Sequence, residues 1–203
     1  MRLKNKALFL DRDGVINKNF GYVFSMKNFI WLKNVKKAIK YAYTKKYLII
    51  VVTNQSGVAR GLYSENDIKK LHNEINKQLK KINCKIHDFF YSPYHPKYGN
   101  KKYRRDSFLR KPNPGMIFKA AKKWNIDQNK SLMIGDKRAD MIAAKRSNLR
   151  FIKKKYNLLR EVKKNLILDW LKFYLFKIFI FFILMICAME CINLYEKLFT
   201  QTI

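Results

Sequence analysis

The chain is poor in cysteine, glycine and proline, and each shortage excludes a class of protein. Its 203 residues include only 3 cysteines, too few for a disulfide scaffold or a four-ligand zinc site, so we expect a reduced, cytoplasmic protein. With 7 glycines and 4 prolines, collagen-like and low-complexity chains are excluded. Hydrophobic residues make up 48% of the chain, which is enough to fill the core of one catalytic domain.

Acidic residues are also scarce, and the chain is therefore strongly basic. The sequence has 14 Asp and Glu residues against 44 Lys and Arg residues, and its formal net charge is +30. Such a charge favours a partner that is a polyanion, an acidic membrane surface or a phosphorylated substrate. Only 10 of the basic residues are arginine, however, and proteins that read nucleic acid favour arginine forks. We therefore do not expect nucleic acid to be the partner.

The composition changes near residue 163, which divides the chain into an expected domain at 1–162 and a hydrophobic tail at 163–203. Residues 178–189 carry no charge, and the window 171–189 approaches the length of a membrane span, with both lysines near its N-terminal side. Three interpretations stay open. The tail is a membrane anchor that holds the domain on the cytoplasmic face, an apolar helix packed on the domain or on a partner, or a non-native extension of the reading frame.

Before the tail, short apolar runs alternate with segments of helical periodicity. The expected strands span 6–10, 47–52 and 132–134, and the expected helices span 35–43, 68–82, 114–124 and 139–147. This alternation is typical of βαβ units, so we predict an α/β fold with a Rossmann-like, mainly parallel sheet flanked by helices and followed by a C-terminal apolar helix. The proline-containing segment 92–114 is expected to form a long loop beside the site.

Polar residues follow each expected strand directly. The three segments are Asp11-Arg12-Asp13-Gly14, Thr53-Asn54-Gln55-Ser56-Gly57 and Gly135-Asp136-Lys137. Because the carboxyl ends of the strands line the ligand site of an open α/β sheet, we expect these segments to converge. Together they supply three carboxylates, a hydroxyl, an amide and glycines that permit close approach of the backbone.

The carboxylates suit phosphoryl transfer assisted by a metal ion. Asp11 and Asp136 offer the hard oxygen ligands that Mg²⁺ prefers. With the metal offsetting the repulsion of the phosphate, the Asp11 carboxylate can attack phosphorus and form an aspartyl-phosphate intermediate. Asp13, two residues further on, is placed to protonate the leaving oxygen and then to activate water.

Three further residues can stabilise the negative charge of the transferred group. The Thr53 hydroxyl and the backbone N–H of Asn54 can donate hydrogen bonds to phosphoryl oxygens. Lys111, which precedes an expected helix, supplies a positive charge for the transition state.

These segments, in this order, resemble the four motifs of the haloacid dehalogenase superfamily of phosphatases. The matching residues are Asp11-Arg12-Asp13-Gly14-Val15-Ile16-Asn17, Thr53-Asn54, Lys111, and Gly135-Asp136 with Asp140. The longer strings at 53–61, 110–116 and 135–137 resemble the D-glycero-D-manno-heptose 1,7-bisphosphate 7-phosphatases of this superfamily. The resemblance runs from about Leu8 to Ile152 and gives the tail no counterpart.

The resemblance implies a cytoplasmic hydrolase that removes the 7-phosphate of a small sugar bisphosphate in nucleotide-activated heptose and lipopolysaccharide core synthesis. The sequence leaves the oligomeric state open, and we favour a monomer. It implies Mg²⁺ held by Asp11, Asp136 and the backbone carbonyl of Asp13, with Asp140 supporting the metal site. It assigns catalysis to Asp11, Asp13, Thr53 and Lys111. It assigns substrate contacts to Asp11, Arg12, Asp13, Asn19, Phe20, Gly21, Tyr22, Thr53, Asn54, Gln55, Ser56, Arg110, Lys111 and Lys137.

The chain departs from this family in two places. Phe20 stands where a polar residue is more common, which bears on the sugar contacts. Many relatives also hold a structural zinc in the long loop through cysteines and a histidine, whereas the corresponding residues here are Ser92, Tyr94, Ser107 and Leu109. We therefore predict a zinc-free loop that is held by its prolines and by the packing of Tyr91, Tyr94, Tyr98 and Tyr103.

Two alternatives to the sugar phosphatase stay open. A histidinol-phosphate phosphatase has similar motifs, although the string Ser-Gly-Val-Ala-Arg-Gly at 56–61 argues against it. A polynucleotide 3′-phosphatase, or a basic protein that binds nucleic acid by charge alone, would use the positive charge directly.

Overall fold

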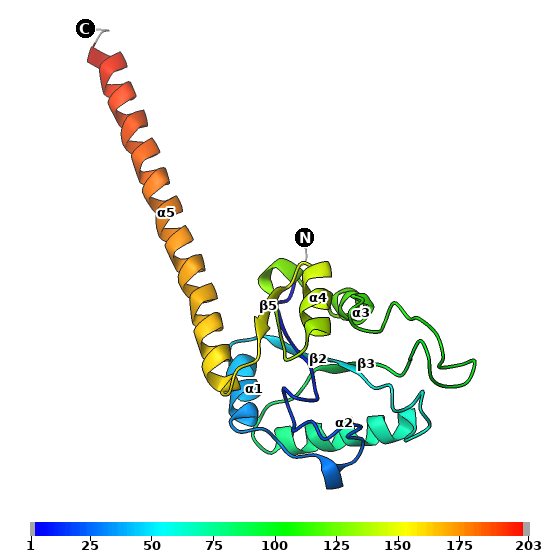
Figure 1. Ribbon diagram of the computed structural model, residues 1–203. Coiled ribbons are helices and arrows are strands. Elements are labelled where there is room, and N and C mark those ends of the chain that lie inside the picture. The colour runs from blue at the N-terminus through cyan, green and yellow to red at the C-terminus, as the bar shows by residue number, and fades with distance from the viewer. Residues whose placement is uncertain (1–2, 201–203) are drawn as a thin grey trace. The chain divides into compact units, whose positions relative to one another are not determined.

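The computed structural model of this protein describes residues 3–200, without the side chains of 169–170, 172–173 and 192–200 (Figure 1). It contains two compact units, one ending at Lys163 and one beginning at Lys164. In chain order the elements are β1 (Ala7–Leu10), η1 (Met26–Asn28), α1 (Val35–Thr44), β2 (Leu48–Asn54), α2 (Glu65–Lys80), β3 (Asp88–Ser92), α3 (Gly115–Trp124), η2 (Gln128–Lys130), β4 (Leu132–Gly135), α4 (Arg138–Arg146), β5 (Arg150–Lys153) and α5 (Leu158–Thr200).

The five strands form one parallel sheet in the order β3-β2-β1-β4-β5. Leu8 in the central strand pairs with Ile49 on one side and with Leu132 on the other. The chain thus adds β2 and β3 on one side of β1, and then crosses over to add β4 and β5 on the other side. Ligands bind at such a switch point, outside the carboxyl ends of the strands, and Asp11 and Asp136 directly follow the two strands that meet there.

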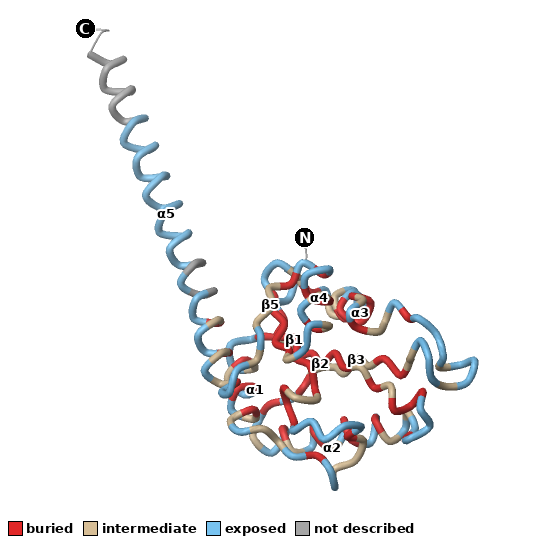
Figure 2. Tube along the Cα trace, in the orientation of Figure 1, coloured by how far each residue is buried: buried red, intermediate tan, exposed pale blue. Residues whose placement is uncertain are grey.

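Helices cover both faces of the sheet, and the core lies between them. Figure 1 shows α3 and α4 on one side of the strands and α1 and α2 on the other. Since side chains alternate along a strand, Phe9 and Val52 pack with Met116 and Ala143 on the first side, whereas Leu8 faces the second. Figure 2 shows that buried residues concentrate in the strands. A core on both faces makes the sheet a rigid base for the segments that leave its carboxyl edge.

The predicted α/β fold is confirmed, and all three predicted strands and all four predicted helices are present within a few residues of their expected bounds. α2 begins three residues earlier than its apolar pattern suggested because Ser64 caps it, accepting a hydrogen bond from the Asp67 N–H at 3.2 Å. Residues 93–114 contain no helix or multi-residue strand, as expected. Strands β3 and β5 were not predicted. Both are half-buried edge strands, so neither has the continuous apolar run of a central strand.

Candidate active site

A buried ion-pair cluster lies at the carboxyl edge of the sheet. Asp11 is the first residue after β1, and Lys111 stands at the end of the long loop. The Nζ atom of Lys111 donates to Oδ1 of Asp11 at 2.7 Å and to the carbonyl oxygen of Val52 at 2.8 Å, and it lies 2.6 Å from Oδ1 of Asp140. The side chains of Lys111 and Asp11 are only 4% and 6% exposed. One cation therefore binds two carboxylates in a site largely sealed from water.

Burial and charge act against each other on these groups. Burial raises the pKa of Asp11 to about 6, although Lys111 lowers it. Burial alone would lower the pKa of Lys111, but Asp11 and Asp140 together raise it above its usual value. Lys111 therefore stays an ammonium ion at neutral pH, and Asp11 is mainly a carboxylate there.

The side chain of Asn54, at the end of β2, fixes the backbone of Lys111. Its Oδ1 accepts from the Lys111 N–H at 3.0 Å, and its Nδ2 donates to the Lys111 carbonyl oxygen at 2.9 Å. These two bonds join residues that lie 57 positions apart in the sequence. The sequence suggested the Asn54 backbone as a phosphate donor; its side chain has this additional role of placing the lysine.

Three carboxylates come together where a metal ion could bind. Oxygen atoms of Asp11, Asp136 and Asp140 lie within 4.8 Å of one another. Asp140 is already engaged, because Lys111 pairs with it and the backbone N–H of Lys137 donates to its Oδ2 at 3.0 Å. By contrast, Oδ1 of Asp136 is buried and has no hydrogen-bond partner among the described residues.

Asp136 can occupy this position because Gly14 faces it. A Cβ atom on Gly14, whose φ is +93°, would collide with the Asp136 carboxylate. Burial raises the pKa of Asp136, and Lys137 opposes that effect. Hard oxygen donors with one unpartnered, buried atom fit Mg²⁺, so Asp11 and Asp136 are the side chains that would hold it, while Asp140 orients Lys111.

The carboxylate of Asp13 is held by three donors. The guanidinium of Arg12 lies 2.9 Å from its Oδ2, Nε2 of Gln55 donates to the same oxygen at 2.9 Å, and Nδ2 of Asn17 donates to Oδ1 at 3.0 Å. Arg12 is fully buried and also donates to the carbonyl oxygen of Val23 and to Oε1 of Gln55. The side chains of Arg12 and Gln55 thus support Asp13, and a direct contact of either with substrate stays a prediction.

Gln55 connects the segments that follow β1 and β2. Besides Asp13, its Nε2 donates to Oγ1 of Thr53 at 2.8 Å, and its Oε1 accepts from the hydroxyl of Tyr63 at 2.8 Å. Burial raises the pKa of Tyr63 to about 12, so this hydroxyl keeps its proton. Because the Thr53 hydroxyl accepts from Gln55, its own hydrogen remains available to donate to a ligand.

His72 contacts the guanidinium of Arg12, a role that the sequence analysis missed. Its Nε2 lies 3.5 Å from Nη1 of Arg12, and its ring stacks on Phe89 with centroids 4.1 Å apart. Burial, followed by the charge of Arg12, lowers the pKa of His72 well below its ordinary value. The only signal in the sequence was a histidine within the apolar stripe of α2, which is also typical of a core residue.

We expect this histidine to make the fold sensitive to acid. In the unfolded chain His72 binds a proton near pH 6.5, whereas in the folded chain it stays neutral to a much lower pH. The free energy of unfolding should therefore fall as pH drops below about 6.5, by up to about 1.4 kcal/mol per pH unit. Urea denaturation at several pH values from neutral to mildly acidic measures this slope. His72→Gln should reduce this slope, and an unchanged slope in that variant would contradict the assignment. His95→Gln is the comparison: the pKa of this more exposed histidine is lowered less far than that of His72, so its replacement should change the slope less.

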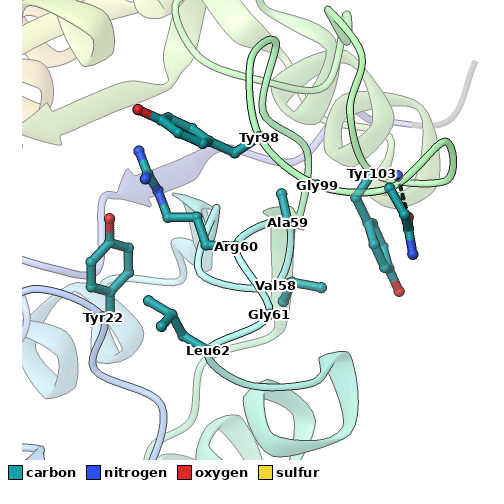
Figure 3. Close-up of a pocket in the computed structure, with 10 residues that line it drawn as sticks. Tyr22, Val58, Ala59, Arg60, Gly61, Leu62, Tyr98, Gly99 and Tyr103 are labelled. Carbon is teal, nitrogen blue, oxygen red and sulfur yellow. Dashed lines mark hydrogen bonds between the residues drawn. The ribbon is translucent and has the colours of Figure 1, made fainter.

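A pocket of about 800 Å³ opens at the same edge of the sheet (Figure 3). It is lined by Tyr22, Val58, Ala59, Arg60, Gly61, Leu62, Tyr98, Gly99, Asn100 and Tyr103. Figure 3 shows Arg60 between two aromatic rings: its guanidinium carbon lies 3.6 Å from the ring centroid of Tyr98 and 5.9 Å from that of Tyr22. The pocket thus combines aromatic walls with a cation, which suits a polar, anionic ligand.

The remaining predicted contact residues are mostly accessible. Asn19, Phe20, Gly21 and Tyr22 form an exposed loop after β1 in which Oδ1 of Asn19 accepts from the Gly21 N–H at 3.0 Å. Lys137 is exposed, and Ser56 and Arg110 are half-buried. Arg110 donates to the carbonyl oxygen of Tyr94 at 3.0 Å, which places it in the long loop. All of these substrate contacts stay predictions.

Tyrosines of the long loop and of β3 bind a glutamate at the start of α2. The hydroxyls of Tyr91 and Tyr103 donate to the two oxygens of Glu65 at 2.8 and 2.9 Å. Arg105 lies 4.0 Å from the ring centroid of Tyr94. These contacts can hold the loop without a metal ion. The expected absence of zinc stays a prediction, and metal analysis of chelator-washed protein tests it.

Glu65→Gln should loosen this loop. The substitution removes the charge from both hydrogen bonds with the tyrosines, and a bond to a charged group contributes about 1.5–3 kcal/mol. We expect the free energy of unfolding to fall by about 2 kcal/mol and proteolytic cleavage within 93–114 to accelerate. Glu74→Gln, at an exposed pair with Lys77 on the same helix, should change neither measurement. Equal cleavage rates in the two variants would show that Glu65 does not hold the loop.

Comparison with known proteins identifies the family. The family model described as polynucleotide kinase 3 phosphatase matches residues 7–164. A D-glycero-alpha-D-manno-heptose-1,7-bisphosphate 7-phosphatase of Burkholderia mallei is 43% identical over 70% of this chain and 75% of that protein. The corresponding beta-heptose enzyme of Rhodopseudomonas palustris is 39% identical over 72% and 81%.

A solved structure agrees with these relatives. The D,D-heptose 1,7-bisphosphate phosphatase of B. bronchiseptica, complexed with magnesium and phosphate, superposes with a TM-score of 0.68 at 26% identity and covers 79% of this chain and 86% of that one. The identities, the shared fold and the acidic cluster lead to one conclusion. The chain belongs to the D-glycero-D-manno-heptose-1,7-bisphosphate 7-phosphatase family of the haloacid dehalogenase superfamily.

Proposed function

We propose that the chain is a magnesium-dependent phosphatase that hydrolyses D-glycero-D-manno-heptose 1,7-bisphosphate at the 7-phosphate, giving the 1-phosphate and inorganic phosphate. The observation that carries the proposal is the buried Asp11–Lys111 pair, 2.7 Å apart, beside Oδ1 of Asp136, which has no hydrogen-bond partner in the described part of the chain. A nucleophile, a fixed cation and a metal ligand thus surround one small space. The related enzymes of Burkholderia mallei and Rhodopseudomonas palustris are named for this substrate.

The residues present account for both halves of the reaction. A carboxylate oxygen of Asp11 attacks phosphorus, and the bond from phosphorus to the sugar oxygen breaks as Asp13 gives that oxygen a proton. Asp13 then takes a proton from water, whose oxygen attacks the aspartyl-phosphate; phosphate leaves and the Asp11 carboxylate is restored. Lys111 and the Thr53 hydroxyl stabilise the charge on the phosphoryl oxygens.

Asp11 and Asp136 would hold the magnesium ion, together with the backbone carbonyl of Asp13 that the family resemblance implies. When bound, the ion supplies positive charge that reduces repulsion between the Asp11 carboxylate and an incoming phosphate. The Lys111 ammonium supplies further positive charge beside Asp11, where Asp140 keeps it in place. The solved relative from B. bronchiseptica contains magnesium and phosphate, which supports this arrangement.

The second phosphate of the substrate would bind near the pocket of Figure 3. The pKa of His95 is lowered, chiefly by burial and then by Arg110, Arg60 and Lys97. Since all three cations act on one imidazole, positive charge gathers on this side of the loop. We assign the phosphate that is not hydrolysed to Arg60 and Arg110.

Arg60→Met tests this assignment. Loss of the cation should raise the KM for the bisphosphate roughly tenfold to a hundredfold, because a hydrogen bond to a charged group contributes about 1.5–3 kcal/mol. The kcat should change little, and the KM for a substrate with one phosphate should stay the same. Steady-state kinetics on both substrates measure the difference, with Lys101→Met, at an exposed lysine of the long loop, as control. An equal loss on both substrates would place Arg60 outside a site for the second phosphate.

A polynucleotide 3′-phosphatase is the second candidate, because the matching family model carries that description and the chain has a net charge of +30. Phosphate release with Mg²⁺ should be measured on heptose 1,7-bisphosphate, histidinol phosphate and a 3′-phosphorylated oligonucleotide. We expect the highest kcat/KM on the heptose. A higher value on the oligonucleotide, falling steeply with salt, would overturn the proposal in favour of the nucleic-acid enzyme.

A further inference from the structure

The C-terminal helix α5 contains a long apolar segment that the phosphatase fold does not use. Within it, the 18 residues Tyr174–Cys191 have a mean hydropathy of 2.1, and none of this window is buried. The family model ends at residue 164, before the segment begins. We propose that Tyr174–Cys191 crosses a lipid bilayer once and holds the phosphatase domain at the cytoplasmic face of the membrane. The inference is independent of which phosphate ester the domain hydrolyses.

The segment is apolar on all sides. The consecutive residues Ile178, Phe179, Ile180 and Phe181 are 40%, 62%, 41% and 65% exposed, and because successive helical residues are rotated by about 100°, their side chains point to all sides of the helix. A helix that lies on a membrane surface or packs on a partner has one apolar face and one polar face. An apolar helix without a polar face fits full immersion in hydrocarbon instead.

Length and position agree with a span. At 1.5 Å per residue the 18-residue window is about 27 Å long, close to the roughly 30 Å of a hydrocarbon core. A core helix of a soluble protein and a signal sequence can have the same composition. A core helix is mostly buried, however, and a signal sequence lies near the N-terminus. This window is wholly exposed and begins at residue 174.

The charges near the span give it a direction. Lys177 and Glu190, the two charged residues within the window, lie near its ends, where a long side chain can reach the interface. The basic residues that precede the span within about 20 residues include Lys155, Arg160, Lys163 and Lys164, whereas residues 192–203 contain one basic residue, Lys197. Because basic flanks stay in the cytoplasm, this asymmetry places the phosphatase domain there.

Fractionation of the full chain tests the proposal. Membranes from cells that express it should be washed with high salt and with alkaline carbonate, and then floated through a density gradient. We expect the protein to remain in the membrane after both washes and to float with lipid. Recovery in the soluble fraction, release by salt, or a lipid-free pellet would each overturn the span, since they indicate a soluble protein, a surface attachment by charge, or an aggregate.

Variants of the full chain make the test specific. Ile180→Arg with Leu184→Arg places two charges in the middle of the span and should shift most of the protein out of the floating fraction. Ile167→Arg with Leu168→Arg adds the same charges to exposed positions before the span and should leave the protein in the membrane. Equal behaviour of the two variants would overturn the assignment of the span to these residues.

Thiol labelling gives a second readout that does not depend on fractionation. A maleimide that cannot cross membranes should fail to label Cys187 in sealed or open membranes, and should label it once detergent dissolves the bilayer. Cys84, which is 3% exposed in the core, is the internal reference for folded protein. A Lys154→Cys variant should gain a thiol that reacts in lysed cells but not in intact ones. Labelling of Cys187 without detergent, or of the introduced thiol in intact cells, would contradict the span or its direction.

Discussion

Asp11→Asn is expected to lower the rate of phosphate release by about 10⁴-fold or more, the scale of effect that follows loss of a nucleophile. An amide has no anionic oxygen to attack phosphorus, so the aspartyl-phosphate cannot form. The fold should survive, because Lys111 keeps its ion pair with Asp140 and its hydrogen bond to the carbonyl oxygen of Val52. Steady-state release of phosphate with Mg²⁺ measures the loss.

Two controls separate a lost nucleophile from a damaged protein. Asp106→Asn removes an exposed carboxylate from the long loop and should retain full activity. Urea denaturation should give a similar midpoint for Asp11→Asn and the native chain. Activity of Asp11→Asn within a few-fold of the native chain, with an unchanged midpoint, would remove Asp11 from its role.

Lys111→Met should damage both stability and activity. The variant leaves the carboxylates of Asp11 and Asp140 buried together without their shared cation, and breaking a buried ion pair typically costs about 3–5 kcal/mol. Loss of the charge that faces the phosphoryl group should also lower kcat by about 10²–10³-fold. Because Lys111 lowers the pKa of Asp11, that pKa should rise in the variant, and any residual activity should need a higher pH.

Lys119→Met, an exposed lysine on α3, is the matched control and should behave like the native chain. Should Lys111→Met fail to fold, Lys111→Met with Asp140→Asn tests the electrostatic account, because it removes one of the two unpaired charges. We expect the double variant to be more stable than Lys111→Met while its kcat stays as low as that of the single variant. A double variant no more stable than the single one would show that repulsion between the carboxylates is not the cause.

The strands β1, β2 and β4, which lead to Asp11, Asn54 and Asp136, could be predicted because their apolar runs are continuous, and a central strand buried on both faces needs such runs. The edge strands β3 and β5 could not, because one of their sides has no neighbouring strand and their side chains are only half-buried. Where a strand is only half-buried, its sequence need not be apolar throughout, and the continuous apolar run that predicts a strand is absent.

The hydrogen bonds that hold the active-site side chains in place could not be predicted from local sequence patterns. Arg12 lies between two aspartates, and its side chain is fully buried among Asp13, Gln55 and His72, where it supports Asp13. Its direct contact with substrate stays a prediction. The hydrogen bonds of Asn54 to Lys111 connect segments 57 residues apart. Such contacts depend on how strand ends and loops meet in space, and no spacing along the chain encodes that.

Residue types and their order account for the chemistry available to this protein: acidic residues directly after apolar strands, a lysine before a helix, and an apolar segment of 18 residues whose two charges lie near its ends. These follow from residue type and order alone. The folded chain adds that Lys111 binds Asp11 and Asp140 together, that Oδ1 of Asp136 has no hydrogen-bond partner among the described residues, and that the described side chains of the apolar span are exposed. The reason is physical, because the strength of charged and apolar contacts depends on distance and burial, which arise only when distant segments meet.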